Sequence, residues 1–297
     1  MRFAGGQFLG DRRRRLQAGG IEVADMRPTV PRDAVEAHTH DEAHLLVLHH
    51  GAYRSSARGM PAVCTVPAVI LNPPGTHHRD CFDTLDDARF LTISLAPACW
   101  ASVATALPMP GEAVRLTPLA LPAAYRAWQG LLAGDDAGVL DVETEVHALL
   151  HRAAEAPAAS GPHVLPAWLV RARERLDDAP GEVPGIAVLA RDAGLHPVYF
   201  ARAFRRAHGV SPGDYLRRRR LERAIDGLCG RRLPSLAELA LHCGYADQSH
   251  MANALRQATG TSPRALRRLA RLEVADLQDR GARRGQAVAI ATPERRP

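Results

Sequence analysis

The pattern of hydrophobic positions changes from β-like to helical near residue 97. Between residues 37 and 97, short apolar runs are separated by clusters of Gly, Pro and Asp, which is typical of a small antiparallel β-barrel or sandwich. The runs are Leu45–Leu48, Val63–Val66, Val69–Leu71 and Phe90–Leu95. From residue 97 to 152, leucine and valine recur at helical spacing with acidic residues between them, so this stretch predicts helices.

Stretches without such a pattern predict the domain boundaries. Residues 1–36 are rich in Gly and Arg, and we expect them to form a loose lead-in to a first domain over residues 37–152. Residues 153–163 are small and contain Pro, which indicates a linker to a second domain over residues 164–271. The apolar pattern then fades into Arg, Gly and Pro, so residues 272–297 predict a basic, disordered tail.

The second domain contains the same pair of helix signals twice. In the first copy, Pro184 opens a helix that ends at Gly194, and Pro197 opens a second helix that ends at Gly209. Two short helices joined by a tight turn with glycine form a helix-turn-helix.

In the second copy, each matching residue lies about 50 positions later in the chain than in the first. Ser235 and Glu238 form a capping box, which predicts a helix from there to Gly244. Another helix is expected from Asp247 to Gly260. We therefore expect an all-α domain with two helix-turn-helix units.

Arginine is expected on the faces opposite the predicted core. Phe200 and Phe204 share one face of their helix, which leaves Arg202, Arg205 and Arg206 pointing outward. A generic helical hairpin would not predict this arrangement.

The helix between the two units opens at Ser211 and has four arginines in a row, Arg217–Arg220. A helix of about 18 residues spans about 27 Å, which is near the roughly 34 Å between successive major-groove faces on one side of DNA. The pattern predicts two recognition helices in adjacent major grooves, with some of these arginines at phosphates and others solvated.

The two predicted domains differ in the sign of their net charge. All 38 Lys+Arg residues are arginine, and the formal net charge is +6 with a pI of about 9.5. Residues 1–162 have 14 Arg against 18 Asp and Glu, residues 163–271 have 19 against 10, and the tail has 5 against 4. A GC-rich genome explains the missing lysine but not this asymmetry, which indicates a polyanionic partner for the second domain.

Composition narrows the class of protein. The hydrophobic content of 46% and the charged content of 24% are ordinary for a soluble protein. We find neither an apolar stretch of about 18 residues for a membrane span nor an apolar segment after Arg12–Arg15 for a secretory signal. Five cysteines without a CxxC pair indicate reduced thiols, so we expect a cytoplasmic protein.

Two segments of the second domain resemble the double helix-turn-helix DNA-binding domain of bacterial AraC/XylS-type transcriptional regulators. They read LARDAGLHPVYFARAFRRAHGVSPGDYLRRRRLERA and SLAELALHCGYADQSHMANALRQATGTSPRALRRL. The resemblance covers about residues 166–271. It departs from the family at Met251 and Leu255, where Phe is usual, and at Leu266, where an aromatic residue is usual.

By position, the resemblance implies two sets of groove-facing residues. They are Val198, Ala201, Arg202 and Arg205 in the first unit, and Gln248, Ser249, Ala252, Asn253 and Arg256 in the second. Arg grips guanine and Asn grips adenine through paired hydrogen bonds, so Arg202 and Asn253 are the preferred base readers. Arg206 and Arg218 are expected at phosphates, and His250 is expected in a structural or phosphate-contacting role.

Histidine is concentrated in the first domain, where seven of the 14 histidines lie between His38 and His78. His38, His40, Glu42 and His44 share parity, so in one strand they would point to the same face. About 30 residues after His44, a Pro-Gly turn is followed directly by Thr76, His77 and His78.

The two histidine segments are similar to the two cupin motifs, which bind a metal inside a β-barrel. The resemblance implies His38, His40 and His78 as metal ligands with His44 in place of the usual glutamate, and His77 is an alternative to His78. Such an all-histidine site suits Zn, Ni, Cu or Fe. Related sensor domains keep these residues as polar pocket lining without metal, so no cofactor is required. The expected effector pocket contains His38, His40, Glu42, His44 and His78.

Together these observations predict an α+β multidomain protein with a cupin-like antiparallel β-barrel and helices in front and an all-α double helix-turn-helix behind. The expected function is sequence-specific transcriptional regulation, as activator or repressor, and not catalysis. The expected partners are double-stranded DNA, a small-molecule effector and, for an activator, RNA polymerase. Helices over residues 118–152 either form a homodimer surface or pack on their own barrel.

Two other functions fit parts of the sequence. A metal-dependent cupin enzyme with a DNA-binding appendage would use the histidines, but no nucleophile triad, phosphate loop or carboxylate pair accompanies them. An architectural protein that binds DNA without sequence choice would need only the basic charge. Two separately capped recognition helices favour sequence readout over that alternative.

Overall fold

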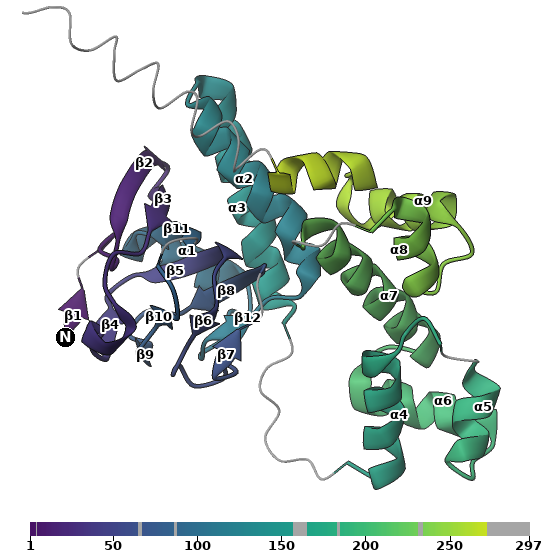
Figure 1. The fold of residues 1–297 in the computed structure, drawn as a ribbon. Coiled ribbons are helices and arrows are strands. Elements are labelled where there is room, and N and C mark those ends of the chain that lie inside the picture. Colours follow the sequence, from purple (N-terminus) through teal and green to yellow (C-terminus); the bar gives the residue numbers. More distant parts are fainter. Residues whose placement is uncertain are drawn as a thin grey trace, which may run out of the picture.

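The computed structural model describes residues 1–3, 5–64, 67–85, 88–156, 165–182, 185–230 and 234–271 (Figure 1). Its N-terminal part is rich in strands and its C-terminal part is helical, as expected. Pro184, the tail 272–297 and most of the predicted linker lie outside the described residues. No described helix is both long and apolar enough to span a membrane.

The described strands form three sheets. The largest is antiparallel and has the order β12-β8-β5-β11-β3-β2. Its strands are β2 (Asp11–Ala18), β3 (Ile21–Arg27), β5 (Ala43–His50), β8 (Ala68–Asn72), β11 (Arg89–Leu95) and β12 (Val114–Arg115). The two small sheets contain β1 (Arg2–Phe3), β4 (His38–His40) and β9 (His77–His78), and β6 (Tyr53–Arg54), β7 (Val63–Cys64) and β10 (Cys81–Phe82).

The β-rich part differs from the predicted closed barrel. Among the described strands, no sheet closes on itself. The small sheets have strands of only two or three residues, and none of these strands pairs with a described strand of the large sheet.

Residues 1–36 were expected to be a loose lead-in, and this expectation is wrong for β2 and β3. Both strands belong to the large sheet, where β3 pairs with β11 and β2 forms the edge. The arginines of β2 are exposed or half-buried, as suits an edge strand. The short helix η1 (Arg32–Ala34) follows them.

Helices over residues 97–154 cover this sheet, as their periodicity predicts. They are α1 (Pro97–Ala106), the short η2 (Pro118–Ala120), α2 (Leu121–Ala133) and α3 (Asp136–Ala154). Tyr125 and Trp128 of α2 are fully buried. Arg89 of β11 lies 5.0 Å from the ring centre of Trp128 and forms a paired salt bridge with the buried Asp25 of β3. These contacts attach α2 to the sheet.

The C-terminal part contains the two predicted helix-turn-helix units. Its helices are α4 (Ala167–Asp178), α5 (Ile186–Asp192), α6 (Pro197–His208), α7 (Pro212–Cys229), α8 (Leu236–His242) and α9 (Gln248–Thr259). All four predicted glycine stops have positive φ angles, including +76° at Gly209 and +68° at Gly260. The capping box of Ser235 and Glu238 is present, with both of its hydrogen bonds.

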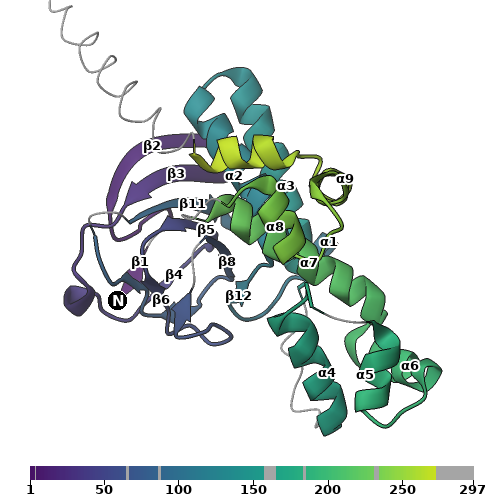
Figure 2. The ribbon, with the colours of Figure 1, turned by 45° about the vertical axis from the view of Figure 1, so that its right-hand side comes forward.

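The two units are packed differently. The first unit has a separate core, which α4, α5 and α6 share with the beginning of α7. The second unit and the later part of α7, including Leu221, Ile225 and Leu228, belong to one hydrophobic core with η2, α2 and α3. In both views α7 runs from the side of α2 and α3 to the first unit (Figure 1, Figure 2).

Candidate nucleic-acid interface and histidine cluster

Helix α6 presents an arginine-rich face to solvent. Phe200 and Phe204 are fully buried on its inner side. Arg202 lies midway between them in sequence and therefore points to the opposite side, where it is exposed. Arg205 and Arg206 flank it and are exposed. In the described part of the chain, the side chains of Arg202 and Arg206 have no hydrogen bond or ion pair, so both guanidinium groups are available to a ligand.

Helix α9 repeats this arrangement with different chemistry. Met251 and Leu255 are fully buried, and Asn253 lies opposite them on the exposed side. The guanidinium of Arg256 donates a hydrogen bond of 2.6 Å to Oδ1 of Asn253. The side-chain amide of Asn253 is therefore oriented by a neighbouring positive charge.

Most of the other predicted groove-facing residues are exposed. Val198 is 53% exposed, and Gln248 and Ser249 are exposed in the first turn of α9. Ala201 and Ala252 are half-buried at the edges of the two faces. Small side chains at these edges leave room for close approach of another surface.

His250 has contacts of its own within the second unit. Its backbone N–H donates to Oδ1 of Asp247 at 2.8 Å, and its ring packs edge-on against Tyr245 at a centroid distance of 5.2 Å. The histidine side chain remains exposed. These contacts agree with a structural role, and the phosphate-contacting role stays a prediction.

Two exposed residues were not predicted as part of these faces. Tyr199 is 59% exposed one turn before Arg202, and Gln257 is exposed one turn after Asn253. The selection by family position omitted both of them. A helical projection would have found them, because each lies within about 60° of the centre of its polar face at 3.6 residues per turn.

The arginine run of α7 divides into structural and exposed members. Arg219 forms an ion pair with Asp177 at 2.9 Å, and Arg220 donates to the carbonyl of Pro180 at 2.9 Å, so both attach α7 to the end of α4. Arg218 is more exposed, and its Nε lies 3.1 Å from Oε1 of the buried Glu222. This ion pair holds the guanidinium of Arg218 on the helix surface.

The repeated units match a known family of domains. Residues 189–269 match the family model described as a helix-turn-helix domain, which is of the AraC type. The chain is a DNA-binding transcriptional regulator with an AraC-type helix-turn-helix domain at residues 189–269. Double-stranded DNA is accordingly its partner. No curated protein matches the chain at a significant level.

Solved structures resemble the C-terminal part of this regulator. One is the C-terminal domain of AraT, a response regulator from Geobacillus stearothermophilus, with 28% identity, 35% of this chain and 87% of that chain covered, and a TM-score of 0.33. Another is the DNA-binding domain of AdpA in complex with a target DNA, with 25% identity, 36% and 95% coverage and a TM-score of 0.33. A third is a probable AraC family regulator from Rhodopseudomonas palustris, with 26% identity, 34% and 96% coverage and a TM-score of 0.31.

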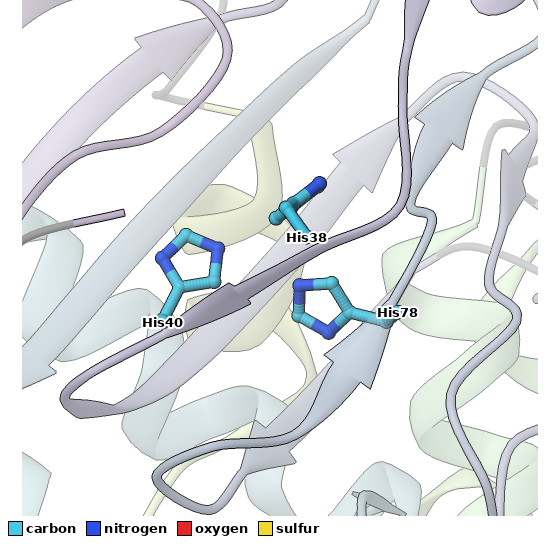
Figure 3. Close-up of side chains that lie close together, drawn as sticks. All are labelled: His38, His40 and His78. Carbon is cyan, nitrogen blue, oxygen red and sulfur yellow. The ribbon is translucent and has the colours of Figure 1, made fainter. Parts of the chain in front are cut away.

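The regulator has a second candidate site in its β-rich part, where four histidines meet. His38 and His40 lie on β4, and His78 lies opposite His38 on β9 (Figure 3). His44 lies on β5, so the predicted single strand is in fact two strands separated by a turn. All four side chains are nevertheless buried and face the same cavity.

The histidine rings are in contact with one another. Ring centres are 4.7 Å apart for His38 and His78, 5.3 Å for His40 and His78, and 4.4 Å for His40 and His44. Phe3 and Phe8 cover the cluster, with ring centres 4.7 Å from His38 and 4.9 Å from His40. The cluster is therefore enclosed by apolar rings and shielded from water.

Burial determines the charge state of these rings. Burial, reinforced by the neighbouring histidines, lowers the pKa of His40 to about 2 and that of His44 to about 3. Burial also lowers the pKa of His78. These three imidazoles are neutral near pH 7, and each keeps one nitrogen lone pair.

The structure separates the predicted pocket residues into two groups. The cavity is lined by His38, His40, His44 and His78, with apolar residues around them. Glu42 does not line this cavity. It lies in the turn between β4 and β5, and its half-buried carboxylate lies against Gly5. His77 is exposed on the other side of β9, so His78 is the histidine that joins the cluster.

Proposed function

We propose that this regulator recognises two successive major-groove segments of its DNA sequence-specifically, with α6 reading one segment and α9 the other. The observation that supports this most directly is the repeated polar face. In each helix a hydrogen-bonding side chain, Arg202 or Asn253, stands opposite two buried apolar residues. Such a face can reach base edges while the buried side holds the helix in position.

The surrounding charges favour binding to a phosphate backbone. Arg205 and Arg206 lie beside Arg202 on the same surface. Contacts between arginine side chains and phosphates position a protein on DNA without specifying sequence. We assign Arg202 to a base because it lies at the centre of the face, and Arg206, which lies one turn later and about 40° from that centre, to a phosphate.

We further propose that an effector bound at the histidine cavity controls this activity. Polar groups converge on a mainly apolar cavity there, which is the usual character of a ligand site. The second helix-turn-helix unit shares its hydrophobic core with α2 and α3 of the β-rich part. A change in that part can therefore reach α9 through packed side chains.

The function is tested by selecting binding sequences from a random DNA library and footprinting the protein on them at fixed salt. Two protected segments about one helical turn apart are expected. Arg202→Ala should cost about 1–3 kcal/mol of binding free energy and relax the preference at one base position. Arg206→Ala should weaken all sequences alike and reduce the slope of log affinity against log salt by about 1.

Arg58→Ala is the matched control, because it removes the same charge from the β-rich part of the chain. Arg58 is highly exposed and pairs with Glu112 there. This variant should bind selected DNA like the wild type. If the library yields no sequence that binds better than random DNA, sequence-specific recognition is refuted.

A further inference from the structure

Three of the clustered histidines have nitrogens arranged as metal ligands. Among the described residues, one ligand nitrogen from each of His38, His40 and His78 lies within 4.8 Å of the other two. All three side chains are buried, and Figure 3 shows the His78 ring extending from β9 towards β4. A buried imidazole nitrogen without a hydrogen-bond partner is costly, and Nδ1 of His78 has none within the described chain.

Oxygen atoms outside the cluster lie behind two of these rings, and one of them forms a hydrogen bond. Nδ1 of His38 lies 2.8 Å from the carbonyl oxygen of Glu36 and must donate to it, so the lone pair of His38 is on Nε2. Nδ1 of His78 lies 3.7 Å from Oδ2 of Asp80 and has no hydrogen bond within the described chain. A carbonyl or carboxylate behind the ring is the usual support for a metal-binding histidine.

His44 is excluded from the ligand set by its own hydrogen bonds. Its Nδ1 lies 3.3 Å from the carbonyl oxygen of Glu42, and its Nε2 lies 3.0 Å from Nδ2 of Asn72. Both nitrogens are thus engaged by the protein. The structure therefore reduces the predicted four-histidine set to three.

The size of the cavity favours an ion over a large organic molecule. Its interior free volume is about 50 Å³. Pockets for drug-sized ligands have about 300–1,000 Å³, whereas about 10–15 Å³ of such free volume is enough to hold one water molecule. An ion with a water molecule or a small anion fits this space.

We propose that His38, His40 and His78 bind one divalent first-row transition-metal ion, and that this ion is the effector of the regulator. Three imidazole ligands suit Zn²⁺, Ni²⁺, Cu²⁺ or Fe²⁺, and such a site leaves a coordination position for water or a small ligand. The metal site stands on the histidine geometry alone. Its role as effector rests on the proposed DNA-binding function.

The metal site is tested with the full chain, purified without an affinity tag and treated with a chelator. Titration with Zn²⁺ should give one bound ion per chain, and Co²⁺ should give visible absorption bands of a nitrogen-ligated ion. His40→Gln and His78→Gln should each weaken Zn²⁺ binding at least about 100-fold, because loss of an outer supporting group alone costs about 10–100-fold. The matched control is His77→Gln, which changes the exposed neighbour of His78 and should leave the affinity unchanged.

The proposal is overturned if the folded wild-type chain binds neither Zn²⁺ nor Co²⁺ at micromolar concentration. It is also overturned if His77→Gln weakens binding as much as His78→Gln does. Circular dichroism checks that each variant is folded. If a variant is not folded, the wild-type measurements decide, and Zn²⁺ must raise the Tm of the wild type for the proposal to stand.

The effector role is tested by measuring affinity for the selected DNA with and without Zn²⁺. A change of at least about fivefold is expected, and it should be absent in His40→Gln. Metal binding with unchanged DNA affinity would overturn the effector role alone. A chain that binds metal but shows no preferred DNA would refute the proposed function and leave the metal site intact. A chain that selects DNA but binds no metal would refute only this inference.

Discussion

Phe204→Ala should unfold the first helix-turn-helix unit while the β-rich part and the second unit stay folded. Phe204 is fully buried in a core whose buried members, among the described residues, all belong to α4, α5 and α6. Its ring lies 6.1 Å from the ring of Phe200, 4.4 Å from that of His208 and 5.5 Å from that of Tyr215, measured between centroids. Truncation to alanine removes the centre of this aromatic group.

The expected cost is comparable to the whole stability of the unit. Replacing a buried Phe by Ala costs about 3–5 kcal/mol in free energy of unfolding. A unit of about 50 residues has a stability of about 3–8 kcal/mol at roughly 0.05–0.15 kcal/mol per residue. Since about 1.4 kcal/mol corresponds to a factor of ten, the open population of this unit should rise about 100-fold to a few thousandfold.

Amide hydrogen exchange measured by mass spectrometry resolves this effect by segment. Protection should fall in α4, α5 and α6 and stay at the wild-type level in β3, β5 and β11. On the selected DNA, the footprint should shrink to the segment read by α9. Tyr199→Ala is the control on the same helix, because this exposed side chain should change the stability by no more than about 0.5 kcal/mol.

Leu255→Ala is the comparison in the second unit. Leu255 is fully buried in the core that includes residues of α2 and α3. Its cost of about 2–5 kcal/mol should therefore lower protection in both the second unit and the β-rich part. If Phe204→Ala instead lowered protection evenly along the chain, the first unit would not have a separate core, and the reasoning would be refuted.

Two more predictions concern the second unit. Arg126 of α2 pairs with Glu145 of α3 and donates a hydrogen bond to Oγ1 of Thr261 at 2.8 Å. Arg126→Met should therefore lower the free energy of unfolding by about 1–3 kcal/mol and raise hydrogen exchange in α9. Unchanged exchange there would show that this contact does not hold the second unit in place. Ser235→Ala removes one bond of the capping box of α8 and should lower the free energy of unfolding by about 0.5–2 kcal/mol in urea denaturation, whereas Ser235→Asp, which keeps a capping acceptor, should lower it less.

Local sequence signals were sufficient for the helix-turn-helix units. Gly209 and Gly260 end their helices because only glycine adopts positive φ without strain, and this property is visible in the sequence. Phe200 and Phe204 are buried as their spacing of four residues predicts. Such signals depend on residues close in sequence, so no knowledge of the tertiary fold was needed.

The strands β2 and β3 could not be predicted in the same way. Four consecutive arginines, Arg12–Arg15, hide the strand pattern of β2. Charged side chains are common on edge strands, so this strand lacks a clear apolar alternation. The buried Asp25 interrupts the apolar run of β3, and only its pairing with Arg89, 64 residues away, explains its place in the sheet. Long-range partners of this kind leave no local signal.

The histidine cluster was predicted in composition but not in detail. Parity correctly grouped His38, His40 and His44, although a turn separates the last from the other two. The engagement of His44 by Asn72 depends on the pairing of β5 with β8, which the sequence does not specify. Choosing His78 over His77 likewise required the register between β4 and β9.

Periodicity identifies a buried helix face but does not identify its partner, and α7 shows why this matters. Tyr215 and Leu216 near its start pack on the first unit's core, whereas Leu221 and Leu228 pack in the core shared with η2, α2 and α3. One continuous helix of 18 residues, about 27 Å long at roughly 1.5 Å per residue, thus joins two separate cores. Because a helix resists bending, α7 holds these two cores at a fixed separation. This rigidity suits the proposed reading of two grooves at a fixed spacing. The proposed effector would act on the second unit, because that unit shares its core with α2 and α3, whereas the first unit has a separate core.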